Sequence, residues 1–177
     1  SPTGLIPAIE DGDFSLPDSA AIIQYLDAKH PARPMIPVDA KDRGRALWIE
    51  AYLGACYRDA VHPLFHHRVV AAMRGNSPDT SLTDRVLAEV APKYLAYLDS
   101  IARGKWLVGD AFSVDDISVG ANLVQFHYLG EAAALAHYPA LAAYFRRLVA
   151  TPVFVEQLAA EAPFAAQMGL SQHSMRL

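Results

Sequence analysis

The sequence GLIPAIEDGDFSLPDSAAIIQYL, which spans residues 4–26, decides the fold of the amino-terminal part of the chain. Two short apolar runs flank an Asp11–Gly12 pair, and Asp-Gly between such runs predicts a β-hairpin. Pro7 lies in the first run, where it marks a strand start or an edge strand and fits a cis Ile6–Pro7 bond. A helical run over 20–28 follows. The stretch therefore predicts a strand, a turn, a second strand and a helix.

Asp18 and Ser19 stand at the start of this predicted helix and have the chemistry of a clamp for an amino acid. The first backbone N–H groups of a helix lack partners and carry partial positive charge, so a carboxylate binds there readily beside the Ser19 hydroxyl. Asp18 adds a negative charge that suits an ammonium group on the same ligand. The pair predicts a site for a zwitterion. An ordinary helix start is the alternative, because Ser and Asp are also favoured caps.

The stretch 4–26 resembles the second half of the thioredoxin-like domain of cytosolic glutathione transferases of the bacterial type. In that family the residue before a cis-proline pairs its backbone with the cysteinyl part of glutathione, and an acidic or amide residue followed by Ser holds the γ-glutamyl end. The resemblance implies a glutathione-binding site made of Ile6, Pro7, Asp18 and Ser19. Leu5 departs from the pattern, because many relatives carry a basic residue there, and this weakens one glutathione contact.

The predicted hairpin needs further strands, because an isolated hairpin is marginal in water. The resemblance implies a preceding β-α-β unit, which also carries the Tyr, Ser or Cys that handles the glutathione sulfur. The printed sequence has no such unit and opens with Ser1-Pro2-Thr3. We therefore expect it to be part of a longer protein, with pairing to another copy as the alternative. The catalytic residue stays unassigned among those three types.

A proline-rich linker at 31–38 cannot continue the helix and divides the chain into residues 1–30 and 39–177. Only helical patterns follow it. We expect a long helix from Asp39 towards Ala72, bent or broken near Pro63, then a helix over about 81–102 with Pro92 inside it, and a last helix that begins at Thr151-Pro152. The expected fold is α+β: a partial thioredoxin-like domain of two strands and a helix, followed by an all-α domain.

The segment WLVGDAFSVDDI, residues 106–117, carries the clearest local signal of this second half. Ser113 and Asp116 have the spacing of a capping box, and Phe112 can pack against Ile117 across the helix start. We interpret Ser113 and Asp116 as folding elements without substrate contact. With the preceding W-L-x-G-D, the segment resembles the helix-starting segment of the glutathione transferase C-terminal domain, so the resemblance covers both halves of the chain.

Tyr57, Arg58 and His62 are the candidates for the site of an electrophilic co-substrate. They lie on the predicted long helix, and in bacterial family members polar residues at about this part of the helix line that site. Tyr57 and Arg58 are adjacent and point in different directions, so only one of them need face a cleft. For Arg58 the alternative is a solvated charge or a dimer-interface charge.

Composition limits the other functions that the chain can have. It has 177 residues, of which 53% are hydrophobic and 19% charged, and its net charge is −4. The basic residues are scattered, so we expect no nucleic-acid partner, and no uncharged stretch is apolar enough for a membrane span. His62 and His66 have a metal-ligand spacing, but Pro63 interrupts their face, and we expect no metal. Cys56 is the only cysteine of this sequence, so no intrachain disulfide is possible, which fits a reducing compartment. It lies mid-helix, and we expect it to be a small buried hydrophobe.

The function that these observations favour is a glutathione transferase, an enzyme that adds the glutathione thiolate to a small hydrophobic electrophile. Glutathione would be the co-substrate. The family resemblance implies a homodimer, and we expect a cytoplasmic protein. A non-enzymatic binding or scaffold module with the same fold is the main alternative, because fold does not decide function. A glutathione-dependent isomerase or dehalogenase is the other, and the residues leave the electrophile itself open.

Overall fold

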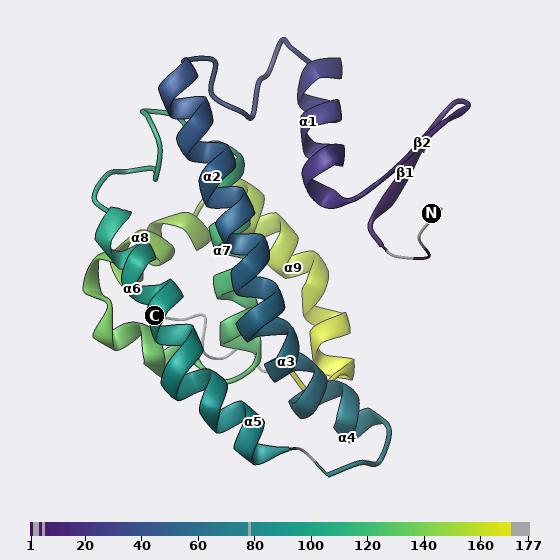
Figure 1. Ribbon diagram of the computed structural model, residues 1–177, viewed down its shortest axis with the longest axis vertical. Coiled ribbons are helices and arrows are strands. Elements are labelled where there is room, and N and C mark those ends of the chain that lie inside the picture. Colours follow the sequence, from purple (N-terminus) through teal and green to yellow (C-terminus); the bar gives the residue numbers. More distant parts are fainter. Residues whose placement is uncertain (2–3, 5, 78, 171–177) are drawn as a thin grey trace.

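The computed structural model describes residues 1, 4, 6–77 and 79–170 (Figure 1). Strands β1 (Ala8–Asp11) and β2 (Phe14–Pro17) pair antiparallel, with Ala8 opposite Pro17 and Asp11 opposite Phe14. Gly12 begins the two-residue turn between them and has a φ of 65°, as the first central residue of a tight hairpin turn often requires. Among the described residues these are the two strands of the chain, and the predicted hairpin is confirmed.

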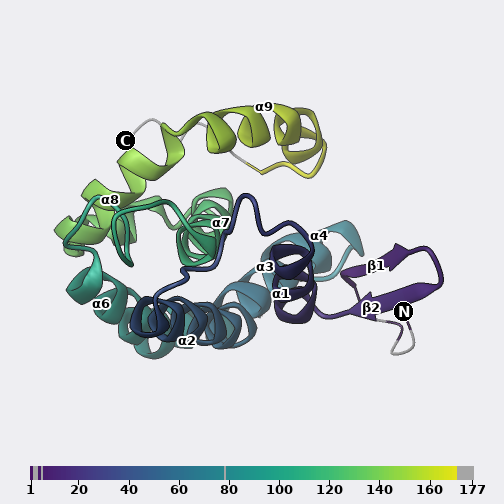
Figure 2. The same ribbon diagram turned by 90° about the horizontal axis from the view of Figure 1, so that it is seen from above.

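Helix α1 (Ser19–Lys29) follows the hairpin and is tied back to it by side chains. The Asp11 carboxylate accepts a hydrogen bond from the Tyr25 hydroxyl at 2.5 Å and pairs with the Lys29 ammonium. The Phe14 and Tyr25 rings lie 5.1 Å apart between centroids. These contacts fix the hairpin on α1, and both views show the hairpin projecting away from the helical body (Figures 1 and 2).

The segment between α1 and the next helix is anchored at both sides. Asp27 Oδ1 accepts hydrogen bonds from the backbone N–H groups of Met35, at 2.6 Å, and Ile36, at 3.0 Å. The Met35 carbonyl accepts one from the Val114 N–H at 2.8 Å. Ile36 is 1% exposed and belongs to the core of the helical body. The proline-rich segment therefore connects the two parts of the chain through fixed contacts.

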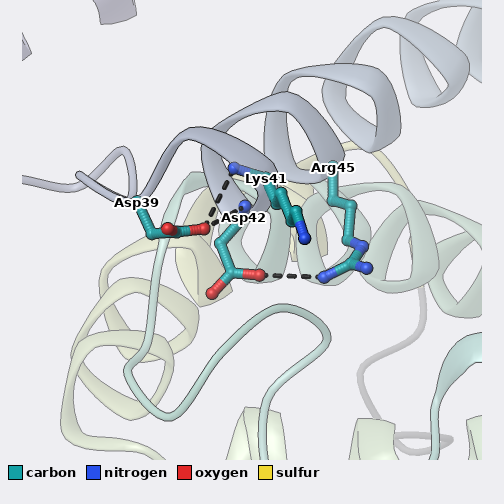
Figure 3. Close-up of polar contacts among 4 residues, drawn as sticks. All are labelled: Asp39, Lys41, Asp42 and Arg45. Carbon is teal, nitrogen blue, oxygen red and sulfur yellow. Dashed lines mark hydrogen bonds and ion pairs between the residues drawn. The ribbon is translucent and has the colours of Figure 1, made fainter.

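A long helical segment begins at Asp39, whose carboxylate accepts hydrogen bonds from the N–H groups of Lys41 and Asp42, and an Asp42–Arg45 ion pair follows in the first turns (Figure 3). The segment runs through α2 (Ala40–Cys56), the π-helical turn η1 (Tyr57–Val61), α3 (His62–Phe65), the π-helical turn η2 (His66–Val70) and α4 (Ala71–Met73). The predicted helix from Asp39 towards Ala72 is confirmed.

Pro63 and Pro92 each lie two residues after the end of a π-helical turn. Pro63 comes after η1, and Pro92 comes after η3 (Val86–Val90), which joins α5 (Thr80–Arg85) to α6 (Ala91–Ile101). A proline ring clashes with the carbonyl four residues earlier, and a wider turn moves that carbonyl away. The helix therefore continues through Pro63, because the π-helical turn before it contains one more residue than an α-helical turn.

The remaining helices complete a layered body around α7. They are α7 (Val114–Tyr128), the 3₁₀ turn η4 (Ala132–His137), α8 (Pro139–Val149) and α9 (Pro152–Gln167). Figure 2 shows α7 between α2 on one side and α9 on the other. Buried side chains of α7 such as Val119 and Leu123 join those of α2 and α8 in one hydrophobic cluster. Thr151 and Pro152 begin α9 as expected.

Candidate functional site

The hairpin brings together the two parts of the predicted glutathione-binding site, Ile6–Pro7 and Asp18–Ser19, which we call the clamp. The Ile6–Pro7 bond is cis. Because Ala8 pairs with Pro17, the residues before β1 and after β2 lie at the same end of the hairpin. The Asp18 N–H donates a hydrogen bond to the Pro7 carbonyl at 3.2 Å. The cis-proline and the start of α1 are thus direct neighbours, although ten residues of sequence separate Pro7 and Asp18.

Asp18 caps α1 from an unusual backbone conformation. Its Oδ1 accepts a hydrogen bond from the Ala21 N–H at 3.1 Å, which satisfies one of the free donors of the helix start. Its φ is 78°, and it is the one residue other than glycine with a positive φ among those described. Such a conformation is costly for a residue with a side chain and tends to occur at functional sites. The carboxylate is exposed at the clamp.

Ser19 and Ile6 are both exposed at the clamp. Ser19 is exposed at the first position of α1, and its hydroxyl makes no hydrogen bond to the described part of the chain. Ile6 is 92% exposed. A helix start with an open hydroxyl and an adjacent carboxylate can bind both ends of an amino-acid group. Leu5, the departure from the family pattern, lies outside the described residues.

A carboxyl group of the helical body senses the negative charge of this site. Glu50 is a half-buried residue of α2, and burial together with the negative charge of Asp18 raises the pKa of its carboxyl group. The long helical segment thus carries a carboxyl group whose pKa responds in part to the charge of the clamp.

A cavity of about 780 Å³ lies between α7, α9 and the segment η1–α3. Its wall is mainly apolar and includes Phe65, Val124, Val153, Phe154, Phe164 and Met168. Small-molecule sites typically have this size and lining. The polar groups of the wall come mainly from α7 and α9: Gln125, Tyr128, Gln157 and Glu161. The sequence offered no signal for these four residues, because their segments come together only in the folded body.

The three residues predicted for the electrophile site take different positions. Tyr57 is 39% exposed and lines the cavity. Arg58 is exposed and pairs with Asp59 at 3.0 Å, and it does not contribute to the described wall. His62 is exposed, with its ring 6.1 Å from that of Tyr57. The structure thus brings Tyr57 to the cavity and leaves Arg58 and His62 outside its lining.

Gly120 allows the close packing of α7 behind this cavity. A Cβ atom at this position would lie 2.2 Å from Cζ of Phe154 and 2.9 Å from Cδ2 of Leu148. Both distances are far below van der Waals contact, so only a hydrogen atom fits. Phe154 is a wall residue of the cavity. The absence of a side chain at Gly120 therefore sets where this ring stands.

The start of α7 contains the predicted capping box between Ser113 and Asp116. The Ser113 N–H donates to Asp116 Oδ2 at 2.9 Å, and the Ser113 hydroxyl donates to Asp115. Asp116 also accepts hydrogen bonds from the Leu107 N–H at 3.1 Å and from the Tyr144 hydroxyl at 2.5 Å. Burial raises the pKa of Asp115 to about 6. These groups lie in the core and hold α7 to its neighbours.

Other candidate chemistry is not assembled in the described part of the chain. Cys56 is buried, and burial raises the pKa of its thiol to about 12, so it is held as a neutral thiol. No cluster of three or more metal-ligating side chains occurs among residues 1, 4, 6–77 and 79–170. Within the same residues, none of the helices combines the length and the apolar character needed to cross a membrane.

Two protein-family models match this chain. The family model for the C-terminal domain of glutathione S-transferase matches residues 64–160, and the model for its N-terminal domain matches residues 1–34. The chain belongs to the glutathione S-transferase family of enzymes. The resemblance and the mixed fold expected from the sequence are thereby confirmed.

Relatives of this chain support the same assignment. A glutathione S-transferase of Triticum aestivum is 32% identical over 127 residues, which are 70% of this chain and 57% of the relative. Glutathione S-transferase 3 of Zea mays is 28% identical, with 90% and 73% covered. A sphingomonad glutathione S-transferase solved in complex with glutathione is 30% identical, has a TM-score of 0.71, and is matched over 91% of this chain and 76% of its own. The maleylacetoacetate isomerase of Dictyostelium discoideum is 24% identical over 93% of the chain.

Proposed function

We propose that this protein adds the thiolate of glutathione to a small apolar electrophile. Glutathione is held at Ile6, Pro7, Asp18 and Ser19, and the electrophile occupies the cavity beside Tyr57. The observation that carries the proposal is the hydrogen bond from the Asp18 N–H to the Pro7 carbonyl, which joins the cis-proline to the open start of α1. A peptide with a free amino-acid end and an extended backbone fits such a junction.

Each group of the clamp has one task in this proposal. The Ser19 hydroxyl and the N–H groups at the start of α1 bind the γ-glutamyl carboxylate, and Asp18 binds the ammonium group. The backbone of Ile6 pairs with the cysteinyl part. The thiol loses its proton to solvent, the sulfur lone pair forms the C–S bond, and the leaving group departs with the electron pair of the bond that breaks. The apolar cavity supplies affinity for the electrophile.

Two other functions share the same fold and ligand. A scaffold would bind glutathione without consuming it, and an isomerase would convert its substrate and release glutathione unchanged. The similarity to a maleylacetoacetate isomerase favours the second of these. The apolar cavity favours conjugation, because an isomerase of that name acts on a carboxylate substrate and the described wall offers no cation to receive one.

We also propose that the protein is a cytoplasmic homodimer. Residues 1–30 form its glutathione-binding part, residues 31–38 the linker, and residues 39–177 the all-α domain.

The proposal is tested by calorimetry and by a conjugation assay on the natural protein. We expect glutathione to bind, and we expect its conjugate with 1-chloro-2,4-dinitrobenzene to accumulate as glutathione is consumed. The Ser19→Ala variant should bind glutathione more weakly. Ser15→Ala is its matched control and should bind as the natural protein does, because Ser15 is an exposed serine of β2 that is not part of the clamp. Binding without any consumption of glutathione would favour the scaffold. Absence of binding would refute the proposed site.

A further inference from the structure

The described wall of the cavity carries one negative charge and no positive charge. Of its described residues, Glu161 is the one that carries a charge at neutral pH, and no Lys, Arg or His belongs to them. Glu161 lies half-buried on α9. Its carboxylate accepts hydrogen bonds from the Tyr128 hydroxyl, at 3.1 Å, and from the Gln157 amide, at 2.8 Å. Both donors are wall residues as well, so the carboxylate is held in place beside the cavity.

Arg68 contacts a wall residue but does not offset this charge. Arg68 donates from Nη1 to the carbonyl of Leu129, a wall residue, at 2.7 Å, but the same atom pairs with the Glu131 carboxylate at 2.5 Å. Arg68 itself is not part of the described wall. Its positive charge is thus already balanced outside the cavity. In the described part of the wall, a ligand therefore meets an apolar surface and one negative charge.

We propose that Glu161 is a specificity-determining residue, which makes the cavity select neutral or cationic apolar electrophiles and reject those that carry a carboxylate or sulfonate. This inference rests on the proposed function of the cavity. An anion placed in the cavity loses its water and finds no cation among the described wall residues, and it is repelled by a fixed carboxylate in a medium of low polarity. A neutral aromatic molecule of the same shape meets neither penalty.

Two fluorescent probes that differ by one sulfonate provide the test. N-phenyl-1-naphthylamine is neutral, and 8-anilinonaphthalene-1-sulfonate has the same ring system with a negative charge. Both are titrated into the natural protein and into its Glu161→Gln variant, which keeps the shape and hydrogen-bonding capacity of the side chain. We expect the variant to bind the sulfonate roughly tenfold more tightly, and the neutral probe within about twofold of its original affinity. Unchanged sulfonate affinity would overturn the inference.

Control variants locate the effect. Glu156→Gln removes an exposed carboxylate of the same helix that is not part of the cavity wall, and it should leave both affinities within about twofold. An equal gain in sulfonate affinity from Glu156→Gln would mean that net charge causes the effect, which contradicts a role of Glu161. Ala121→Trp places a large ring in the cavity and should weaken both probes at least about tenfold. Unchanged binding in that variant would place the probes elsewhere and overturn the inference.

The outcome is separable from that of the proposed function. Probe binding needs no glutathione, so a protein without conjugation activity can still show the charge selection. Conversely, equal conjugation of a neutral aryl halide and its carboxylate analogue would refute the selection and leave the transferase function intact. If Glu161→Gln does not fold, as shown by circular dichroism, Glu161→Ala gives the same comparison of the two probes.

Discussion

Asp18 and Ser19 show how one helix start serves both the fold and the ligand. Asp18 uses Oδ1 to cap α1 and has a positive φ, which is costly for a residue with a side chain. The Ser19 hydroxyl makes no hydrogen bond to the described part of the chain, so it does not cap the helix. The two residues therefore differ in what their substitution tests: Ser19 reports on binding, whereas Asp18 reports on binding and stability together.

Replacing Ser19 by Ala should weaken glutathione binding roughly ten- to hundredfold, because a hydrogen bond to a charged group is worth about 1.5 to 3 kcal/mol. The free energy of unfolding should change little, since the hydroxyl caps nothing. Calorimetric titration with glutathione measures the first effect, and urea denaturation measures the second. The same affinity in the variant as in the unmodified protein would refute the role of Ser19.

Asp18→Asn and Asp18→Ala separate the charge from the cap. Asn still accepts the Ala21 hydrogen bond and tolerates a positive φ, so this variant should keep the unfolding free energy but bind glutathione more weakly. Ala should lose affinity and, in addition, about 1 kcal/mol of stability. Equal losses of stability in both variants, measured by urea denaturation, would show that the charge itself stabilises the helix start.

At the scale of single elements, α7 begins with a group of buried acidic residues. Asp115 has one carboxylate oxygen without a hydrogen-bond partner in the described structure, and Asp116 holds the segment before the helix and the Tyr144 hydroxyl. The helix start is thus specified by hydrogen bonds, which the sequence pattern predicts, and by burial, which it does not.

Ser113→Ala should lower the free energy of unfolding by about 0.5 to 2 kcal/mol, because it removes a cap residue and the partner of Asp115. The KM for glutathione should stay the same in the folded fraction, since α7 starts in the core. Denaturant titration and steady-state kinetics measure the two effects. A large loss of turnover with an unaltered denaturation midpoint would assign Ser113 to catalysis instead.

Asp115 should make stability depend on pH. Its pKa is about 6 in the folded protein and about 3.9 when unfolded, so the unfolded state releases the proton first as pH rises. The resulting destabilisation is absent below about pH 3.9 and complete above about pH 6, with an upper limit of about 3 kcal/mol. Urea denaturation at pH 4 and pH 7 should show this loss in the unmodified protein relative to Asp115→Asn. A constant difference between the two proteins would contradict it.

The helices show how far sequence patterns reach. Helix starts could be predicted at Asp39 and at Thr151-Pro152, because a cap residue stabilises a helix through residues close to it in the sequence. The π-helical turn at 57–61 was not predictable from Pro63 alone, since a proline also ends or kinks helices. That turn matters for the site, because Tyr57 lies in it and faces the cavity while its neighbour Arg58 pairs with Asp59.

At the scale of the whole molecule, the clamp and the cavity come from different parts of the chain. The clamp is local and could be read from residues 4–26, whereas the cavity joins α7, α9 and the segment η1–α3. Glu161 is an acidic residue on an outer helix, and its sequence neighbours give no sign that it faces a ligand. Glu161 comes to line the cavity only when helices that are distant in the sequence pack together.

This separation predicts independent binding of the two substrates. Ala121→Trp should raise the KM for a neutral aryl halide at least about tenfold by filling the cavity. Glutathione affinity, measured by calorimetry, should stay within about twofold of that of the unmodified protein. A parallel loss of glutathione affinity would mean that the cavity and the clamp form one continuous site.

Gly120 gives the molecule a means of adjusting which substrates it accepts without altering any residue that touches them. A methyl group at this position has no room behind the Phe154 ring, and the open side of that ring is the cavity. Adding a methyl group there would therefore push the ring inward and shorten the space for a substrate. A designer could use this one backbone position to lower the size limit for molecules that enter the cavity.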